Sequence, residues 1–416
     1  LDESRQETLR SQLEELDFNL LPLLRSGDGR ARAATGALEP PPSVAAAERG
    51  DETEAAHQGR RDLRAGRVAF ALLAGGQASR LRWDGPKGTF PVGPKSDRSL
   101  FQVLAEHILR AGKDHGKTPP LAVTTSATTD AGIRAFFERH DCFGIHRRRL
   151  SFACQASLPA LDDEGRVILA APDRIFTNPD GHGGALRALA TRGILGAWKE
   201  AGIRTVCTFQ VDNPLLKVVD ADFLGRITTH GVPLATKVVL KTAPEQKVGV
   251  VVRRGGRPAI VEYSEITSEQ AAARDPDGRL TYRLGSIAVH AFRLDFLREA
   301  LDGELPLHAA RKEIPCVDGD GGERRVQGVK FERFLFDLFP MAGDLAVCEV
   351  EREREYEPVK NAEGPESPAT VKAALDREYR RWYAEAGVEP PAPPGEPIEL
   401  SPLEALGPAD LASPDR

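Results

Sequence analysis

The feature that most constrains the fold is a short apolar run that leads directly into a loop containing two glycines. Residues 68–73 read VAFALL, and AGGQASRL follows from Ala74 to Leu81. Glycine lets backbone N–H groups approach a phosphate closely, and Arg80 and the later Lys87 add cationic donors. The pattern therefore predicts a buried strand whose carboxyl end carries an anion-binding loop.

This loop matches neither of the two common nucleotide-binding glycine motifs. It lacks the spacing of the dinucleotide motif GxGxxG and of the P-loop GxxxxGK[ST]. A Gly-Gly pair also occurs in ordinary strand-to-helix turns, where Arg80 and Lys87 would be surface bases. Taken by itself, the loop is compatible with a phosphate site and with a plain turn.

Four more short apolar runs look like strands, and the first runs are separated by stretches of helical pattern. These runs lie at residues 121–124, 206–211, 234–240 and 248–252. Strands that alternate with helices are typical of an α/β sandwich. We expect a Rossmann-like core with a mixed, mostly parallel sheet, whose ligand-binding loops lie at the carboxyl ends of the strands.

Two shorter regions flank this core. Leucines at 9, 13, 16, 20 and 24 recur at three- and four-residue steps, which predicts an amphipathic helix over residues 5–24. Three prolines at 40–42 and an Ala-rich, charged stretch to residue 66 predict a helical connector or linker. After the core, the charged run EVEREREYEP precedes a helix predicted for residues 367–386. We expect an N-terminal helical region (1–66), a core domain (67–354) and a small C-terminal region (355–416).

Composition argues against several classes of partner. The formal net charge of −6 disfavours a nucleic-acid partner, which usually requires a basic surface. No stretch approaches the roughly 18 uncharged apolar residues of a membrane span, so no membrane partner is expected. The five cysteines are an odd number and form no CxxC pair, which predicts reduced thiols. The charged, polar start of the sequence lacks a signal pattern, so we expect a cytoplasmic protein. We also expect a monomer.

The complete string LAGGQASRLRWDGPKG resembles the LAGGxGTRLxxxxPKG signature of nucleotidyltransferases that activate sugar phosphates. Later segments are similar, in order, to the eukaryotic-type UDP-N-acetylglucosamine pyrophosphorylases, part of the wider UDP-sugar pyrophosphorylase family. Seven ordered segments between residues 67 and 361 are far more specific than one glycine loop. These segments are PDGHGGALRAL (179–189), VDNPLLKVVDADFLG (211–225), KTAPEQKVGVV (241–251), VEYSEI (261–266), LPLHAARKEIP (305–315), VKFERFLFDLFP (329–340) and PVKN (358–361).

The resemblance implies a uridylyltransferase, which joins UTP to a sugar 1-phosphate and releases pyrophosphate with the help of Mg²⁺. The attacking sugar-phosphate oxygen is already an anion, so the chemistry needs alignment and charge neutralisation. The family pattern gives Arg80, Lys87 and Lys360 the role of neutralising the phosphates, and Asp212 that of binding Mg²⁺. Without the pattern, Asp212 could equally cap a turn after its strand, and Lys360 would be a surface lysine.

The nucleotide half of the implied site combines backbone and amide groups. Gln155 lies in SFACQASLP, which resembles a family segment whose glutamine hydrogen-bonds the uracil edge. A side-chain amide has both a hydrogen-bond donor and an acceptor, so it can pair with the imide edge of uracil. The backbone of Ala74, Gly75, Gly76 and Gly181 would lie against the nucleotide, because glycine permits close approach. A satisfied interior glutamine and a flexible loop at 181–184 are the alternatives.

The sugar half is implied by the VEYSE segment and by one glycine. Glu262 and Tyr263 correspond to a family pair near the sugar hydroxyls, and Gly249 corresponds to a backbone contact with the same ring. A carboxylate can accept hydrogen bonds from two neighbouring hydroxyls. Strand alternation places Tyr263 with Val261 on the face opposite Glu262, so Tyr263 could instead belong to the core.

Two sugar-binding positions depart from the N-acetylglucosamine pattern. His182 stands where those enzymes have the asparagine of GNGG, and Ser286 where they have the asparagine of GNI. GHG is the form in glucose and broad-specificity UDP-sugar pyrophosphorylases. N-acetylglucosamine 1-phosphate is the first expectation, glucose or galactose 1-phosphate the alternative, and a UDP-sugar sensor without turnover a third hypothesis. The missing GxGxxG argues against a nicotinamide dehydrogenase.

Overall fold

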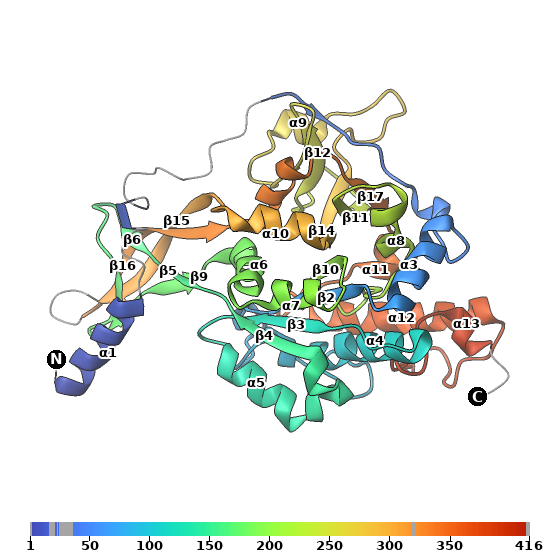
Figure 1. Ribbon diagram of the computed structural model, residues 1–416, viewed down its shortest axis with the longest axis horizontal. Coiled ribbons are helices and arrows are strands. Elements are labelled where there is room, and N and C mark those ends of the chain that lie inside the picture. The colour runs from blue at the N-terminus through green and yellow to red at the C-terminus, as the bar shows by residue number, and fades with distance from the viewer. Residues whose placement is uncertain (1, 16–20, 23, 25–35, 318–321, 413–416) are drawn as a thin grey trace.

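The protein folds around a ten-stranded mixed β-sheet in the computed structural model, which describes residues 2–15, 21, 22, 24, 36–317 and 322–412 (Figure 1). Its strand order is β1 (Leu38–Glu39), β12 (Val250–Arg254), β14 (Leu284–Arg293), β10 (Thr205–Gln210), β2 (Val68–Leu73), β3 (Leu121–Thr125) and β4 (Leu150–Cys154). Three further strands extend it, namely β11 (Leu234–Leu240) beside β14, β17 (Ala346–Glu349) beside β11 and β13 (Arg257–Val261) beside β12. Strands β10, β2, β3 and β4 are parallel, whereas β14 is antiparallel to its neighbours. The expected mixed α/β sheet is confirmed.

Helices cover both faces of this sheet. Phe70 and Leu72 of β2 belong to one hydrophobic cluster, together with helices α4 (Leu100–His115) and α12 (Pro368–Ala386). Ala69 and Ala71 belong to a second cluster, with α6 (Gly181–Thr191) and α10 (Leu294–Asp302). Successive strand residues point to opposite faces, so β2 is buried on both sides. Its uninterrupted apolar sequence follows from that position.

Most predicted elements lie close to their expected bounds. Strands β2 and β11 match the runs at 68–73 and 234–240, whereas β3, β10 and β12 differ from their predicted bounds by one or two residues. The helix expected at 367–386 is α12, and Ser367 is its N-cap. The helix expected at 5–24 is seen as α1 (Glu3–Glu15), and most of its second half lies outside the described residues. The domain boundaries after residues 66 and 354 stay a prediction.

The stretch before the core forms helix α3 (Glu54–Ala65), which crosses α8 (Ala221–Thr229) at very short range. A Cβ atom at Gly59 would lie 1.9 Å from the carbonyl oxygen of Ala221, and one at Gly225 would lie 1.8 Å from that of Ala55. Only glycine fits at both places. The crossing holds α8 and the loop before it against the N-terminal part of the chain.

A second, three-stranded sheet forms an arm beside the core. Strands β15 (Leu307–Val317) and β16 (Glu323–Arg333) pair along their full length, and β16 also pairs with β6 (Leu161–Asp162). Figure 1 shows this hairpin, in orange, extending away from the central sheet. The end of β16 returns to the core, where the N–H of Arg333 donates to the carbonyl oxygen of Asp180 at 2.7 Å. The arm therefore delivers the residues after β16 to the start of α6.

All five cysteines are free thiols. Within the described ranges, no helix combines the length and apolar character needed to cross a membrane.

Buried His290 on β14 should make the stability of the fold depend on pH. Its side chain is buried, and its Nδ1 lies 2.9 Å from Thr236 Oγ1. Burial, with a smaller contribution from His182, lowers the pKa of His290 to about 3. In the unfolded chain a histidine gains a proton near pH 6.5, whereas folded His290 stays neutral, so its contribution to stability is lost as pH falls from 6.5 toward 3.

His290→Gln removes this titration and should flatten the loss of stability with falling pH. At pH 5 the wild type should have lost about 2 kcal/mol through this group relative to pH 7.5, because one pKa unit corresponds to about 1.4 kcal/mol. Urea unfolding at both pH values measures the difference. His57→Gln is the control, because that side chain is 49% exposed. An unchanged pH dependence in His290→Gln would contradict the assignment.

Candidate active site

The glycine loop forms one wall of a cleft at the carboxyl end of β2. The loop is held by hydrogen bonds from the N–H of Ala74 to the carbonyl oxygen of Thr124 (3.1 Å) and from the N–H of Lys87 to that of Gly76 (3.2 Å). The cleft has a volume of about 280 Å³ and is lined by all four charged residues predicted for phosphate and metal binding. The lining residues are Gln77, Ala78, Ser79, Arg80, Leu81, Lys87, Asp212 and Lys360.

Asp212 enters the cleft from the strand next to β2. Strand β10 runs parallel to β2 with Gln210 opposite Leu73, so the two strands end together. Asp212 Oδ2 accepts a hydrogen bond from Lys87 Nζ at 3.1 Å, and the two side chains are 13% and 17% exposed. This pairing holds a cation and a carboxylate side by side at the cleft wall.

Lys360 reaches the same cleft from a segment far along the chain. The N–H of Val359 donates to the carbonyl oxygen of Asp212 at 2.8 Å, so the backbone carrying Lys360 runs beside Asp212. Lys360 Nζ lies 3.3 Å from both Tyr356 Oη and Glu366 Oε1. Burial would lower the pKa of Lys360, but the influence of Tyr356, Asp212 and Glu366 outweighs it and raises the pKa. Lys360 is therefore a cation in the cleft.

A buried network of charges supports this wall from behind. Lys237 on β11 is completely buried, and its Nζ lies 2.9 Å from Asp220 Oδ2 and 2.5 Å from Glu355 Oε2. The carbonyl oxygen of Glu355 accepts a hydrogen bond of 2.7 Å from Asn213 Nδ2. Because Asn213 directly follows Asp212, the network links the position of Asp212 to the segment after Glu355.

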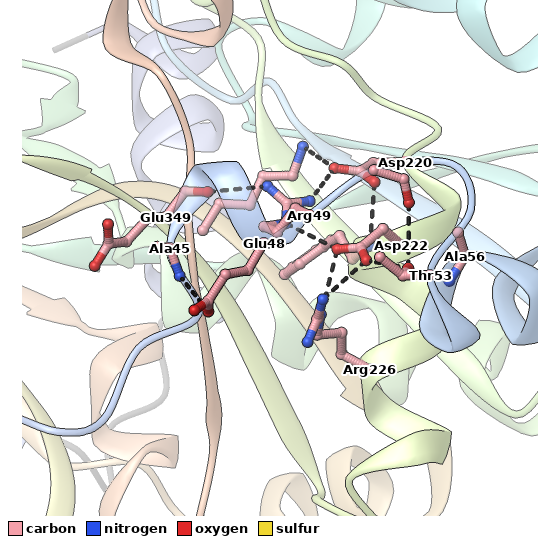
Figure 2. Close-up of polar contacts among 12 residues, drawn as sticks. Ala45, Glu48, Arg49, Thr53, Ala56, Asp220, Asp222, Arg226 and Glu349 are labelled. Carbon is pink, nitrogen blue, oxygen red and sulfur yellow. Dashed lines mark hydrogen bonds and ion pairs between the residues drawn. The ribbon is translucent and has the colours of Figure 1, made fainter.

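Arg49 joins this network from the N-terminal part of the chain. Figure 2 shows Arg49 between Asp220 and Asp222, with Arg226 on the other side of Asp222. Arg49 Nη2 lies 2.5 Å from Asp220 Oδ2, and its Nε lies 2.8 Å from Asp222 Oδ2. Burial would raise the pKa of Asp220, but Arg49 and Lys237 outweigh it and hold that pKa well below its ordinary value. The buried carboxylate is therefore ionised.

The glutamine predicted to bind uracil lies directly against the glycine loop. A Cβ atom at Gly75 would come within 2.6 Å of Gln155 Oε1, so the contact requires glycine. Gln155 Nε2 donates to Asp180 Oδ1 at 3.1 Å and to the carbonyl oxygen of Gly181 at 3.0 Å. The structure thus brings Gly75, Gln155 and Gly181 together. It adds Asp180, a member of the PDGHGG segment that the sequence pattern does not single out.

Three of the residues predicted to bind the sugar gather where β12, β13 and β14 meet. The N–H of Ser286 donates to the carbonyl oxygen of Gly249 at 2.8 Å, and a Cβ atom at Gly249 would lie 3.2 Å from Glu262 Oε1. Burial, together with Glu265, raises the pKa of Glu262, and His308 opposes them. A half-buried carboxylate in this position can accept hydrogen bonds from hydroxyl groups.

Tyr263 does not belong to the core, so the placement from strand alternation is wrong. Strand β13 ends at Val261, and the chain then turns, with the N–H groups of Glu265 and Ile266 donating to the carbonyl oxygen of Glu262. The side chain of Tyr263 is 50% exposed. Alternation fails here because it holds only while the strand continues. A contact between Tyr263 and the sugar stays a prediction.

His182 packs among aromatic side chains at the start of α6. Its ring centroid lies 5.2 Å from that of Phe334 and 4.8 Å from that of Phe336, and its Nδ1 accepts a hydrogen bond of 2.8 Å from the N–H of Leu335. Burial, with a smaller effect of His308, lowers the pKa of His182 to about 4. The ring is thus neutral near pH 7 with its proton on Nε2. The two phenylalanines come from the VKFERFLFDLFP segment, and the four phenylalanines of this segment are the sequence signal that could have indicated them.

The surroundings of Asp212 fit a magnesium ion that arrives with a nucleotide. Mg²⁺ usually takes one or two protein carboxylates and keeps water or substrate phosphates as its other ligands. The cleft offers the carboxylate of Asp212. The described part of the chain contains no group of three or more His, Cys, Asp or Glu that could hold a metal alone. Asp212 would therefore share the ion with phosphate oxygens.

An α/β sandwich with a cationic glycine loop after one strand and a carboxylate after its parallel neighbour has the architecture of a nucleotidyltransferase. A family model agrees: the one described as UTP–glucose-1-phosphate uridylyltransferase matches residues 32–364. The chain belongs to this family of uridylyltransferases.

Individual relatives are similar to this chain over most of their own length. The UDP-N-acetylglucosamine pyrophosphorylase of Saccharomyces cerevisiae is 36% identical over 337 residues, which are 77% of this chain and 71% of the relative. The UDP-N-acetylhexosamine pyrophosphorylase-like protein 1 of Homo sapiens is 38% identical over 88% of this chain and 78% of its own. The crystal structure of the Trypanosoma brucei UDP-N-acetylglucosamine pyrophosphorylase with an inhibitor superposes with a TM-score of 0.84 at 29% identity, covering 99% of this chain and 89% of the other.

Proposed function

We propose that the protein transfers UMP from UTP to a sugar 1-phosphate, first of all N-acetylglucosamine 1-phosphate, and releases pyrophosphate. The single observation that carries the proposal is the cleft in which Arg80, Lys87, Asp212 and Lys360 converge beside the glycine loop. A site that only binds a UDP-sugar has no use for a full set of cations at the position of the leaving pyrophosphate. The charge set therefore favours turnover over a sensor.

In this reaction a phosphate oxygen of the sugar attacks the α-phosphorus of UTP. A new P–O bond forms there, the bond from the α-phosphorus to the bridging oxygen breaks, and pyrophosphate leaves with the electron pair. Because the nucleophile is already an anion, the protein needs to align the two phosphates and to balance their charge. Arg80 and Lys87 would stabilise charge on the leaving group, and Lys360, which lines the same cleft, would draw the phosphates together.

Asp212 is the residue proposed to hold Mg²⁺. When bound, the ion would lower the repulsion between the phosphates and the incoming anion. Lys87, at 3.1 Å from Asp212, would keep the carboxylate oriented while the nucleotide binds.

The preferred sugar is inferred from the relatives and from the surroundings of His182. The relatives at 36–38% identity carry N-acetylglucosamine or N-acetylhexosamine in their names. A neutral His182 beside Phe334 and Phe336 offers a hydrogen-bond donor next to an apolar surface, which suits an acetamido group. Glucose or galactose 1-phosphate is the alternative substrate, favoured by the GHG segment.

Pyrophosphate release from UTP with a panel of sugar 1-phosphates in Mg²⁺ tests the proposal. The panel pairs each N-acetylated sugar with its non-acetylated counterpart. We expect release with N-acetylglucosamine 1-phosphate and slower release with glucose 1-phosphate. Release with no member of the panel would favour the sensor hypothesis instead.

Glu262→Ala should raise the KM for the sugar phosphate more than the KM for UTP. The carboxylate lies beside Gly249, whose carbonyl oxygen accepts the N–H of Ser286. Loss of a hydrogen-bonded charge costs about 1.5–3 kcal/mol, or roughly tenfold or more in KM. Initial-rate kinetics with each substrate varied in turn measure the two effects. Glu265→Ala is the matched control, because Glu265 is an exposed carboxylate three residues away. Equal rises in both KM values would place Glu262 outside the sugar pocket.

A further inference from the structure

The side-chain amide of Gln155 has one end that is fully bonded and one end that is not. Nε2 donates to Asp180 Oδ1 at 3.1 Å and to the carbonyl oxygen of Gly181 at 3.0 Å. No donor from the described residues bonds to Oε1, although the residue is only 7% exposed. Turning the amide over would place Oε1 against two acceptor oxygens. The surroundings therefore dictate which end of the amide is left for a ligand.

The vacant oxygen lies against the glycine loop. A Cβ atom at Gly75 would come within 2.6 Å of Gln155 Oε1, which puts this oxygen where a base stacked along the loop would meet it. This oxygen is free to accept a hydrogen bond from a ligand, and a ligand that covered it without a donor would leave it unpaired at a cost of about 1–3 kcal/mol. The imide N3–H of uracil is such a donor. Cytosine presents an acceptor at the same ring position and would face the oxygen with a repulsive pair.

Asp180 is itself held in one place. It is 2% exposed, its Oδ2 lies 3.3 Å from Arg333 Nη1, and its carbonyl oxygen accepts the N–H of Arg333 at 2.7 Å. A Cβ atom at Gly184 would come within 1.9 Å of Asp180 Oδ1, so only glycine leaves room for the carboxylate. These contacts aim one carboxylate oxygen at Arg333 and the other at Gln155.

We infer that Asp180 is a positioning residue for base recognition: it holds the Gln155 amide with its oxygen toward the base, and this orientation selects uracil over cytosine. The inference rests on the proposed UTP-dependent transfer and specifies how that site reads its base. Asp180 acts through Gln155.

The charge of Asp180 sets the conditions for a test. Burial raises the pKa of Asp180 to about 6, against the opposing effects of Arg333, the Gln155 hydrogen bond and Arg187. Arg333 comes from β16 and Arg187 from α6, and Glu304 pairs with both arginines. At pH 8 the carboxylate is ionised and accepts a hydrogen bond from Gln155 Nε2. The kinetic assays with UTP and CTP should therefore be run at pH 8.

Asp180→Asn separates orientation from shape. Arg333 is a hydrogen-bond donor, so the side-chain oxygen of the asparagine is expected to face Arg333. The NH₂ group of the asparagine then faces Gln155 Nε2. Two donors then face each other, and only the carbonyl oxygen of Gly181 still favours the original orientation of Gln155. We expect the amide to turn over in part of the molecules and to present Nε2 to the base. We expect the ratio of kcat/KM for UTP to that for CTP to fall roughly tenfold or more, through KM, while kcat with UTP changes less than about twofold.

A double-mutant cycle tells positioning from a general structural effect. In a Gln155→Ala background, Asp180→Asn should change the UTP/CTP ratio less than about twofold, since the group it orients is gone. Gly184→Ala pushes the Asp180 carboxylate aside without removing it and should lower the ratio as Asp180→Asn does.

The outcomes of this experiment are distinct. If the wild type releases no pyrophosphate from UTP with any sugar phosphate, the proposed function is contradicted. A wild type that turns over, with the UTP/CTP ratio unchanged in both Asp180→Asn and Gly184→Ala, would overturn the role of Asp180. An equal change of the ratio with and without Gln155 would overturn it too. Urea unfolding of each variant shows which of them are folded, and the ratio is read from those.

Discussion

Replacing Asp212 with alanine should lower the turnover number by at least about tenfold, and replacing Lys87 with alanine should do the same. The two side chains form one hydrogen-bonded pair of 3.1 Å in the cleft that also holds Arg80 and Lys360. Removal of either one would leave its partner without this hydrogen bond, and it would take away the charge that we propose for the pyrophosphate (Lys87) or the metal (Asp212). Initial rates at saturating UTP and sugar phosphate measure the loss. Chelation of Mg²⁺ should abolish turnover in the wild type.

Matched controls lie in the same part of the chain. Asp84 is an exposed carboxylate just after the glycine loop, and Lys95 is an exposed lysine a few residues beyond Lys87. Asp84→Ala and Lys95→Ala should each keep turnover within about twofold, as surface charges away from the cleft contribute little. A wild-type rate in Asp212→Ala would refute its assignment to the metal, and a wild-type rate in Lys87→Ala would refute that residue's role in phosphate binding.

The parts of this site that could be predicted are those determined by residues that are contiguous in the sequence. The strand β2 and the loop after it are contiguous, and an apolar run followed by glycines identifies both without knowledge of the rest of the fold. Asp212 was recognisable because it directly follows an apolar run. Lys360 was recognisable only through the PVKN segment, because its place depends on the hydrogen bond from Val359 to Asp212, across nearly 150 residues.

The parts that could not be predicted depend on pairings between distant segments. Asp180 contacts Gln155, 25 positions away, and Arg333, 153 positions away. The ten-residue strand β14 pairs with β10, β11 and β12 on different stretches of its length, which no local pattern encodes. The error at Tyr263 has the same origin, since the end of β13 is set by its pairing with β12. Periodicity reports a preference for strand or helix, whereas the partner and the end of an element are set by the tertiary fold.

Replacing Lys237 with methionine should lower the free energy of unfolding by about 3–5 kcal/mol, because it leaves buried carboxylates without their cation. Lys237 is completely buried and lies 2.9 Å from Asp220 Oδ2 and 2.5 Å from Glu355 Oε2. Methionine has a similar length, so the change removes the charge with little loss of packing. Urea unfolding at pH 7 measures the effect. Adding Glu355→Gln should recover part of the loss, since one uncompensated charge is then gone.

Lys217→Met is the control for this prediction. Lys217 carries the same charge, but its side chain is 43% exposed and its ion pair with Asp51 is 3.8 Å long, so the expected cost is below about 1 kcal/mol. If Lys237→Met costs no more than Lys217→Met, the buried network does not stabilise the fold. If it costs more, folded Lys237→Met protein should also turn over more slowly than the control, because Glu355 holds Asn213 and thereby the backbone of Asp212.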